Sequence, residues 1–287
     1  MYESMYPLKQ VVKFVNNIKI NYWIGGKGVP VLFLHGFPQS AIMWRKVAPK
    51  MSENFTVICP DLRGYGDSDK PKNGYDKKNM AKDMFMLMQS LDFHKYHLVG
   101  HDRGARVGHR FAIDYQDKLL SLTVLDIVPT LTTFMNTTKE LAAAYWHWFF
   151  FQAVDLSELM IKNSAEPFLR HMFRSLSFNQ NAINEETFKK YLRDFLLPGT
   201  IRATLEDYRA AANVDIRDDE LDIKKKVTCP LLAIWGEYAK MHSLFDVLST
   251  WKDKGENVQG FSVKCGHFIP EELPDELIIS LKNFFES

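Results

Sequence analysis

Short apolar runs alternate with amphipathic stretches along most of the chain. Residues 11–23 alternate apolar and polar positions around Asn16-Asn17, which predicts a hairpin at the edge of a sheet. Continuous aliphatic or β-branched runs then follow at 31–36, 56–61, 97–102 and 122–128. Helical patterns lie between them, at 77–91 and 103–115. Apolar strands separated by helices predict a mostly parallel sheet covered by helices on both faces.

This alternation stops between about Pro129 and Asn213, where the chain is rich in aromatic residues and helix formers. Helices are predicted in this segment at 145–154, 168–176 and 187–197. Strand patterns return at 230–236 and 258–266, before a last helix at 275–285. We therefore predict an α/β core domain formed by residues 1–128 and 214–287, with a helical cap domain inserted at 129–213.

Composition narrows the function classes. The 287 residues carry 36 Lys+Arg against 35 Asp+Glu, a net charge of +1, so the overall charge gives no argument for nucleic-acid binding. Apolar runs are shorter than the roughly 18–20 residues that span a bilayer, and the N-terminus lacks the pattern of a secretory signal. The three cysteines are scattered, which argues against a disulfide framework or a zinc site. We expect a cytoplasmic protein that binds no membrane, no nucleic acid and no metal.

The strongest chemical pattern follows the run at 97–102. Ligands of open α/β sheets bind at the carboxyl ends of the strands. There the chain reads Gly100-His101-Asp102-Arg103-Gly104, which is a nucleophile elbow with Asp in place of Ser. The alternative is that Asp102 only caps the helix that follows it.

A carboxylate nucleophile leaves an ester on the enzyme, so a base must activate water to hydrolyse it. His267 follows the last predicted strand, where this fold places the base. Asp126, at the end of an earlier strand, is our candidate for the acid that orients His267, although it could be only a cap or turn residue. Glu237, after the Trp235-Gly236 pair, is the second candidate.

Two arginines follow the proposed nucleophile. Residues i and i+4 share a helix face, so Arg106 can lie beside Asp102, and Arg103 is its direct neighbour. Because arginine binds carboxylates in a bidentate manner, Arg103 and Arg106 suit a substrate that carries its own carboxylate. The alternative is that they pair with surface acids on an exposed helix face.

The chain resembles the haloacetate (fluoroacetate) dehalogenase family of the α/β-hydrolase superfamily, a relative of epoxide hydrolases and haloalkane dehalogenases. The resemblance rests on segments that match in order: HGFPQ (35–39), DLRGYGDSDKP (61–71), GHDRGARVGHR (100–110), VLDIVPT (124–130), YWHWFF (145–150) and GHFIPEE (266–272). It implies an α/β-hydrolase fold with a cap, acting on a small-molecule substrate without a cofactor, in a chain that could form a homodimer. This chain departs from the family pattern at Ala105, where Gly is common.

The resemblance also implies roles for individual residues. His147, Trp148 and Tyr208 correspond to the halide-binding residues, and the backbone N–H groups of Phe37 and Arg103 to an oxyanion hole. The expected reaction is hydrolytic dehalogenation of a 2-haloacid through an Asp102 ester.

Two other functions fit parts of this pattern. An epoxide hydrolase would use Asp102 and His267 in the same way, with cap tyrosines, here Tyr145 and Tyr208, protonating the opening ring. A non-catalytic small-molecule receptor on the same fold would bind without turnover, but it gives no reason for an intact Asp–His–Asp set. A serine esterase is excluded because the elbow carries a carboxylate instead of a hydroxyl.

Overall fold

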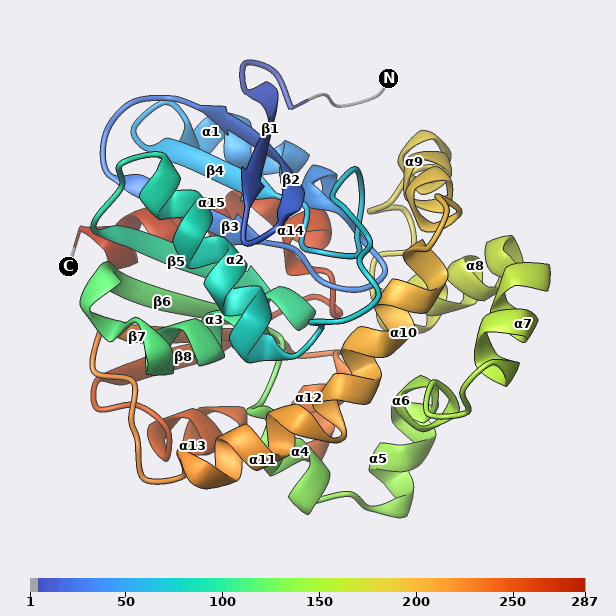
Figure 1. The fold of residues 1–287 in the computed structure, drawn as a ribbon. Coiled ribbons are helices and arrows are strands. Elements are labelled where there is room, and N and C mark those ends of the chain that lie inside the picture. Colours follow the sequence, from blue (N-terminus) through green and yellow to red (C-terminus); the bar gives the residue numbers. More distant parts are fainter. Residues whose placement is uncertain (1–4, 287) are drawn as a thin grey trace.

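The computed structural model describes residues 5–286, and its centre is an eight-stranded sheet within these residues (Figure 1). The strands are β1 (Lys9–Val15), β2 (Ile18–Gly25), β3 (Pro30–Leu34), β4 (Thr56–Pro60), β5 (Tyr96–His101), β6 (Leu119–Leu125), β7 (Leu231–Gly236) and β8 (Val258–Val263). Their order is β1-β2-β4-β3-β5-β6-β7-β8; only the β1–β2 and β2–β4 pairs are antiparallel. This confirms the predicted mostly parallel sheet with the first hairpin at its edge.

Helices cover both faces of the sheet, as predicted (Figure 1). On β5, His97 stacks on Phe285 of α15 (Pro274–Phe285), with ring centroids 4.0 Å apart. The next residue, Leu98, faces α3 (Arg103–Asp114), where a side-chain carbon added at Gly108 would lie 2.8 Å from it. Adjacent strand residues point to opposite faces, so α3 and α15 pack on opposite sides. The core helix α2 (Lys77–Ser90) packs beside α3.

The remaining core elements are short and lie in the connections between the strands and long helices of the core. They are η1 (Ala41–Lys46), α1 (Ala48–Met51), η2 (Gln116–Lys118), α12 (Lys240–Leu244), α13 (Val247–Lys252) and α14 (Ile269–Glu272).

Between β6 and β7 the chain forms only helices in the described residues. They are α4 (Thr130–Met135), α5 (Lys139–Ala144), α6 (Trp146–Phe150), α7 (Leu156–Asn163), α8 (Ala165–Leu176), α9 (Glu185–Phe195), α10 (Thr200–Ala211) and α11 (Val214–Leu221). In Figure 1 they extend from one end of the sheet. We refer to this helical segment as the cap; its last helix, α11, begins at Val214, directly after the predicted boundary at residue 213.

One predicted helix of the cap is wrong. The aromatic run at 145–154 is not continuous, because α6 ends at Phe150 and α7 begins only at Leu156. Its apolar residues do not share one face: Phe151 is fully buried, whereas Val154 is 61% exposed. An apolar run of this kind looks like one helix in sequence, although its members pack in different directions.

None of the described helices combines the length and apolar character that crossing a bilayer requires. Within residues 5–286 no three His, Cys, Asp or Glu side chains are grouped as metal ligands would be.

Candidate active site

Asp102 lies at a sharp turn between β5 and α3, with φ 46° and ψ −116°. Such a backbone costs a non-glycine residue on the order of 1–3 kcal/mol, and it persists only where the surroundings enforce it. The flanking glycines allow the turn. A side-chain carbon at Gly104 would lie 2.4 Å from the carbonyl oxygen of Leu34, and one at Gly100 would lie 2.5 Å from Ala105 Cα.

The side chain of Asp102 is directed away from its own helix. It makes no capping hydrogen bond to α3, so the alternative that Asp102 serves only as a helix cap is wrong. Instead, its Oδ2 atom accepts a hydrogen bond from the backbone N–H of Phe37, at 2.9 Å. Gly36 permits this approach, because any side-chain carbon there would lie 2.5 Å from Asp102 Cβ. Arg103 is the first residue of α3, where backbone N–H groups have no partner inside the helix.

His267 and Asp126 meet at the carboxyl end of the sheet. Asp126 follows β6 directly, in a left-handed conformation with φ 51°. Its Oδ2 atom lies 2.6 Å from His267 Nδ1, and its Oδ1 atom accepts a hydrogen bond from the N–H of Gly236 at 3.0 Å. The carboxylate that contacts the imidazole is therefore that of Asp126, the first of the two candidates, and not that of Glu237.

The pKa values of His267 and Asp102 are shifted in opposite directions by their surroundings. Burial alone would lower the pKa of His267, but the hydrogen bond and the charge of Asp126 outweigh it and raise that pKa above 6.5. Burial alone would raise the pKa of Asp102, but the neighbouring His267 and Arg103 hold it below its usual value. Asp102 is therefore ionised, and His267 is a stronger base than an isolated imidazole.

The two arginines are both buried but differ in their partners. Arg103 is bound by Asp207 of α10: Nε donates to Oδ2 at 3.1 Å, and Nη2 donates to Oδ1 at 2.5 Å. Arg106 donates Nη1 to Val128 O and Thr130 Oγ1, whereas its Nε and Nη2 have no partner among the described residues. Neither arginine lies on an exposed helix face, so that alternative is wrong.

Three cap residues predicted to bind halide lie together above Asp102. His147 and Trp148 are on α6 and Tyr208 is on α10, and all three are buried. The ring of Tyr208 lies 5.8 Å from that of His147 and 5.9 Å from that of Trp148. Burial lowers the pKa of His147 to about 3, so its imidazole is neutral near pH 7 and keeps one N–H donor.

These side chains enclose a small cavity between the sheet and the cap. Its lining residues are Phe37, Asp102, Asp126, Ile127, Tyr145, His147, Trp148, Met172, Leu176, Tyr208, Met241 and His267. The enclosed space, about 10 Å³, is close to the room that one water molecule needs. Arg103 and Arg106 pack against two of these lining residues, with their guanidinium carbons 4.3 Å from the ring centre of Tyr208 and 4.7 Å from that of Trp148.

Sequence reasoning missed the apolar residues that line this cavity. Met172, Leu176 and Met241 come from α8 and α12, and their spacing is that of ordinary core positions, so no signal separated them from the core. It also missed Asp207, although its place beside Tyr208 in the sequence could have drawn attention to it.

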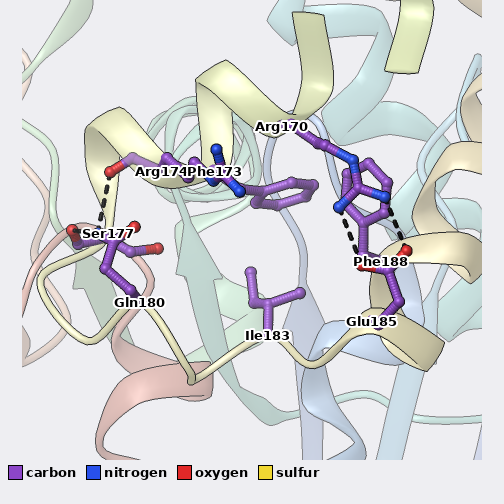
Figure 2. A pocket seen from close by; sticks show the side chains of 8 residues that line it. All are labelled: Arg170, Phe173, Arg174, Ser177, Gln180, Ile183, Glu185 and Phe188. Carbon is purple, nitrogen blue, oxygen red and sulfur yellow. Dashed lines mark hydrogen bonds and ion pairs between the residues drawn. The ribbon is translucent and has the colours of Figure 1, made fainter. Parts of the chain in front are cut away.

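A second cavity, of about 150 Å³, opens on the outside of the cap between α8 and α9 (Figure 2). One of its two arginines is already paired, because Arg170 bonds to Glu185 at 2.7 Å and lies over the ring of Phe188. None of the predicted site residues lines it. The cavity under the cap is therefore the candidate active site.

Comparison with known proteins agrees with the fold. The model of the family described as "alpha/beta hydrolase fold" matches residues 29–274. A fluoroacetate dehalogenase of Burkholderia sp. is 39% identical over 277 residues, covering 94% of this chain and 91% of the relative. A soluble epoxide hydrolase of Corynebacterium sp. (strain C12) is 37% identical over 279 residues, covering 94% and 95%. The solved structure of the epoxide hydrolase CorEH without ligand is 34% identical, with a TM-score of 0.92 and coverage of 97% and 99%.

Proposed function

The chain belongs to the alpha/beta hydrolase fold family, and from this premise we propose that it is a hydrolytic dehalogenase of small 2-haloacids such as haloacetates. In the first step, a carboxylate oxygen of Asp102 attacks the carbon that bears the halogen. The carbon–oxygen bond forms as the carbon–halogen bond breaks, and the halide leaves with the bonding electrons. His147, Trp148 and Tyr208 supply the donors that receive it in a site closed to bulk water.

In the second step, His267 removes a proton from a water molecule that attacks the ester carbonyl. The N–H groups of Phe37 and Arg103 stabilise the oxyanion, and Asp126 stabilises the imidazolium. Collapse of the intermediate returns the Asp102 carboxylate and releases the 2-hydroxyacid. The net reaction replaces halide by hydroxide from water and releases one proton, without any other reactant.

The observation that carries this proposal is the isolation of Arg106. The described chain has six buried arginines, at positions 45, 63, 103, 106, 110 and 209. Five of them form an ion pair with an acidic side chain, and Arg106 forms none. A buried charge without a partner is costly, so a bound carboxylate would supply what the site lacks. Arg106 lies close enough to the nucleophile to lower the pKa of Asp102.

The likeness to named relatives does not choose between substrates, because the fluoroacetate dehalogenase and the soluble epoxide hydrolase are nearly equally similar. The small cavity favours a small substrate over a bulky one. The second candidate is an epoxide hydrolase, which is favoured by one observation: Tyr145 and Tyr208 both line the cavity that contains Asp102. It gives no role to the unpaired charge of Arg106.

One parallel assay separates the two functions. Purified protein is incubated with chloroacetate, fluoroacetate and a panel of neutral epoxides, and free halide and diol are measured. The proposal expects halide from the acids, with fluoride release supporting the cap residues as a fluoride site. Diol from the epoxides without any halide would overturn it in favour of the second candidate.

A further inference from the structure

Asp207 is a buried carboxylate one residue before Tyr208 on α10, and no step of the proposed mechanism uses it. We propose that Asp207 is a positioning residue: it holds the Arg103 guanidinium away from Asp102 and leaves Arg103 Nη1 for the substrate carboxylate, so that it sets the preference for anionic over neutral substrates. This inference rests on the proposed function, because it concerns the site for the substrate carboxylate.

The hydrogen bonds of Arg103 assign three of its five N–H donors to this one residue. Nε and Nη2 donate to the two carboxylate oxygens of Asp207, and Nη2 also donates to the backbone oxygen of Asp207 at 2.9 Å. Nη1 is buried and has no partner among the described residues. A guanidinium held by three bonds has one orientation, and here that orientation leaves the Nη1 amino group, with its two N–H donors, free.

Side chains of the core domain hold Asp207 in place. Its carboxylate accepts bonds from Lys77 Nζ of α2 and from Tyr65 Oη, the latter at 2.8 Å. Lys77 lies within 3.4 Å of a second buried acid, Asp215. Positive and negative groups therefore alternate from Asp215 through Lys77 and Asp207 to Arg103, and the four charges sum to zero.

This charge balance gives the two arginines different roles. Arg103 is neutralised by Asp207 and contributes a directed hydrogen bond, whereas Arg106 has no ion-pair partner among the described residues and interacts with the Asp102 charge only from beyond ion-pair distance. Without Asp207, Arg103 would be an unpaired cation next in sequence to the Asp102 carboxylate. In a low-dielectric site the two charges would attract each other strongly. The Arg103 guanidinium would then bind the Asp102 carboxylate in place of the substrate.

The test compares chloroacetate with 2-chloroacetamide, a neutral substrate of similar shape. For each variant, the ratio of the two kcat/KM values isolates recognition of the carboxylate, because effects on folding or on the nucleophile act on both substrates. In Asp207→Asn we expect this ratio to fall about tenfold, as for loss of one charge-assisted hydrogen bond. The fall should come mainly from a higher KM for chloroacetate.

Two further variants control the interpretation. Asp215→Asn removes the other acidic partner of Lys77 but leaves the Arg103–Asp207 pair, so the ratio should stay within about twofold of wild type. Tyr65→Phe removes only one bond to Asp207 and should lower the ratio in the same direction by about two- to threefold, which keeps the test valid if Asp207→Asn fails to fold. When Asp207→Asn is added to Arg103→Lys, the ratio should fall little further, because both changes disrupt the same Arg103–Asp207 interaction.

The outcomes separate this inference from the proposed function. If wild type dehalogenates chloroacetate but Asp207→Asn changes kcat/KM equally for both substrates, Asp207 is only structural and the inference is overturned. An equal fall of the ratio in Asp215→Asn would overturn it as well. If wild type releases no halide and calorimetry detects no binding of acetate, the proposed function fails and the inference fails with it.

Discussion

His267 Nδ1 lies 2.6 Å from Asp126 Oδ2, although 141 residues separate them in the chain. The contact exists because β6 and the turn after β8 end at the same edge of the sheet, one strand apart. Asp126 is fixed by the N–H of Gly236 at the end of β7, which lies between these two elements. The proposed base is therefore held by the sheet itself, and this arrangement determines how the proposed activity depends on pH.

The pH profile of kcat is the first prediction. His267 must be neutral to accept a proton, so activity should rise with pH through an apparent pKa above 6.5. In Asp126→Asn the imidazolium loses its stabilising charge, so this pKa should fall and the acidic limb should move to lower pH, while the maximal rate decreases. Steady-state rates between about pH 5 and 9 measure both. An acidic limb that stays in place, or moves to higher pH, would contradict the role given to Asp126.

The ester intermediate should accumulate when the base is removed. In His267→Ala, Asp102 keeps its turn, its bond to Phe37 and both arginines, so the first step should proceed and the second should stop. Intact-protein mass spectrometry after incubation with chloroacetate should show one added carboxymethyl group, mapped to the peptide containing Asp102. The double variant Asp102→Asn, His267→Ala is the control and should stay unmodified. Absence of an adduct on the single variant would count against a carboxylate nucleophile.

Arg106→Met should separate activity from stability. We expect kcat/KM for chloroacetate to fall by a factor that corresponds to about 2–4 kcal/mol of lost binding free energy, because the substrate carboxylate loses its buried cation. The free energy of unfolding should be unchanged or higher, since the variant removes a buried charge that has no acidic partner. Denaturant unfolding and initial rates measure the two effects.

Arg63→Met is the matched control for the stability of Arg106→Met. Arg63 is also buried, but it pairs with Asp83 at 2.6 Å, so its replacement leaves a buried carboxylate unpaired. It should lose about 3–5 kcal/mol of unfolding free energy. Equal destabilisation by both variants would show that Arg106 has a structural partner and would remove the main support for carboxylate binding.

The cap aromatics distinguish dehalogenation from epoxide opening. Trp148→Phe keeps the ring that lies beneath Arg106 but removes the indole N–H, so fluoroacetate turnover should fall more than chloroacetate turnover, because fluoride depends more on donors in a dry site. Tyr145→Phe should change both rates by less than about threefold, since Tyr145 has no part in halide departure. Halide-release assays on the two substrates give the comparison. A large loss in Tyr145→Phe with equal effects of Trp148→Phe on both halides would favour a proton-donating tyrosine.

The sheet and the elbow could be predicted because local sequence determines them. Strands that are buried on both faces are continuously apolar, and the turn at Asp102 requires small residues at Gly100 and Gly104. The placement of Asp126 could also be inferred, since it follows a strand and has no rival Asp after Trp235-Gly236. These features depend on a few neighbouring residues.

The cap and the second layer of the site could not be predicted in the same way. Whether the run at 145–154 continues as one helix depends on which way Phe151 and Val154 pack, and that is decided by distant elements. The pairing of Arg103 with Asp207 spans 104 residues and joins the core to the cap. Both arginines could therefore be predicted to lie near Asp102, but only the structure shows that Arg103 is already paired and Arg106 is not.

Release of free chloride from chloroacetate by the purified wild-type protein, with Asp102→Asn as the control, tests the central claim most directly. The account predicts chloride and glycolate in equal amounts from wild type and neither from the variant. Wild type that releases no chloride, or a variant that releases it at the wild-type rate, would contradict the account.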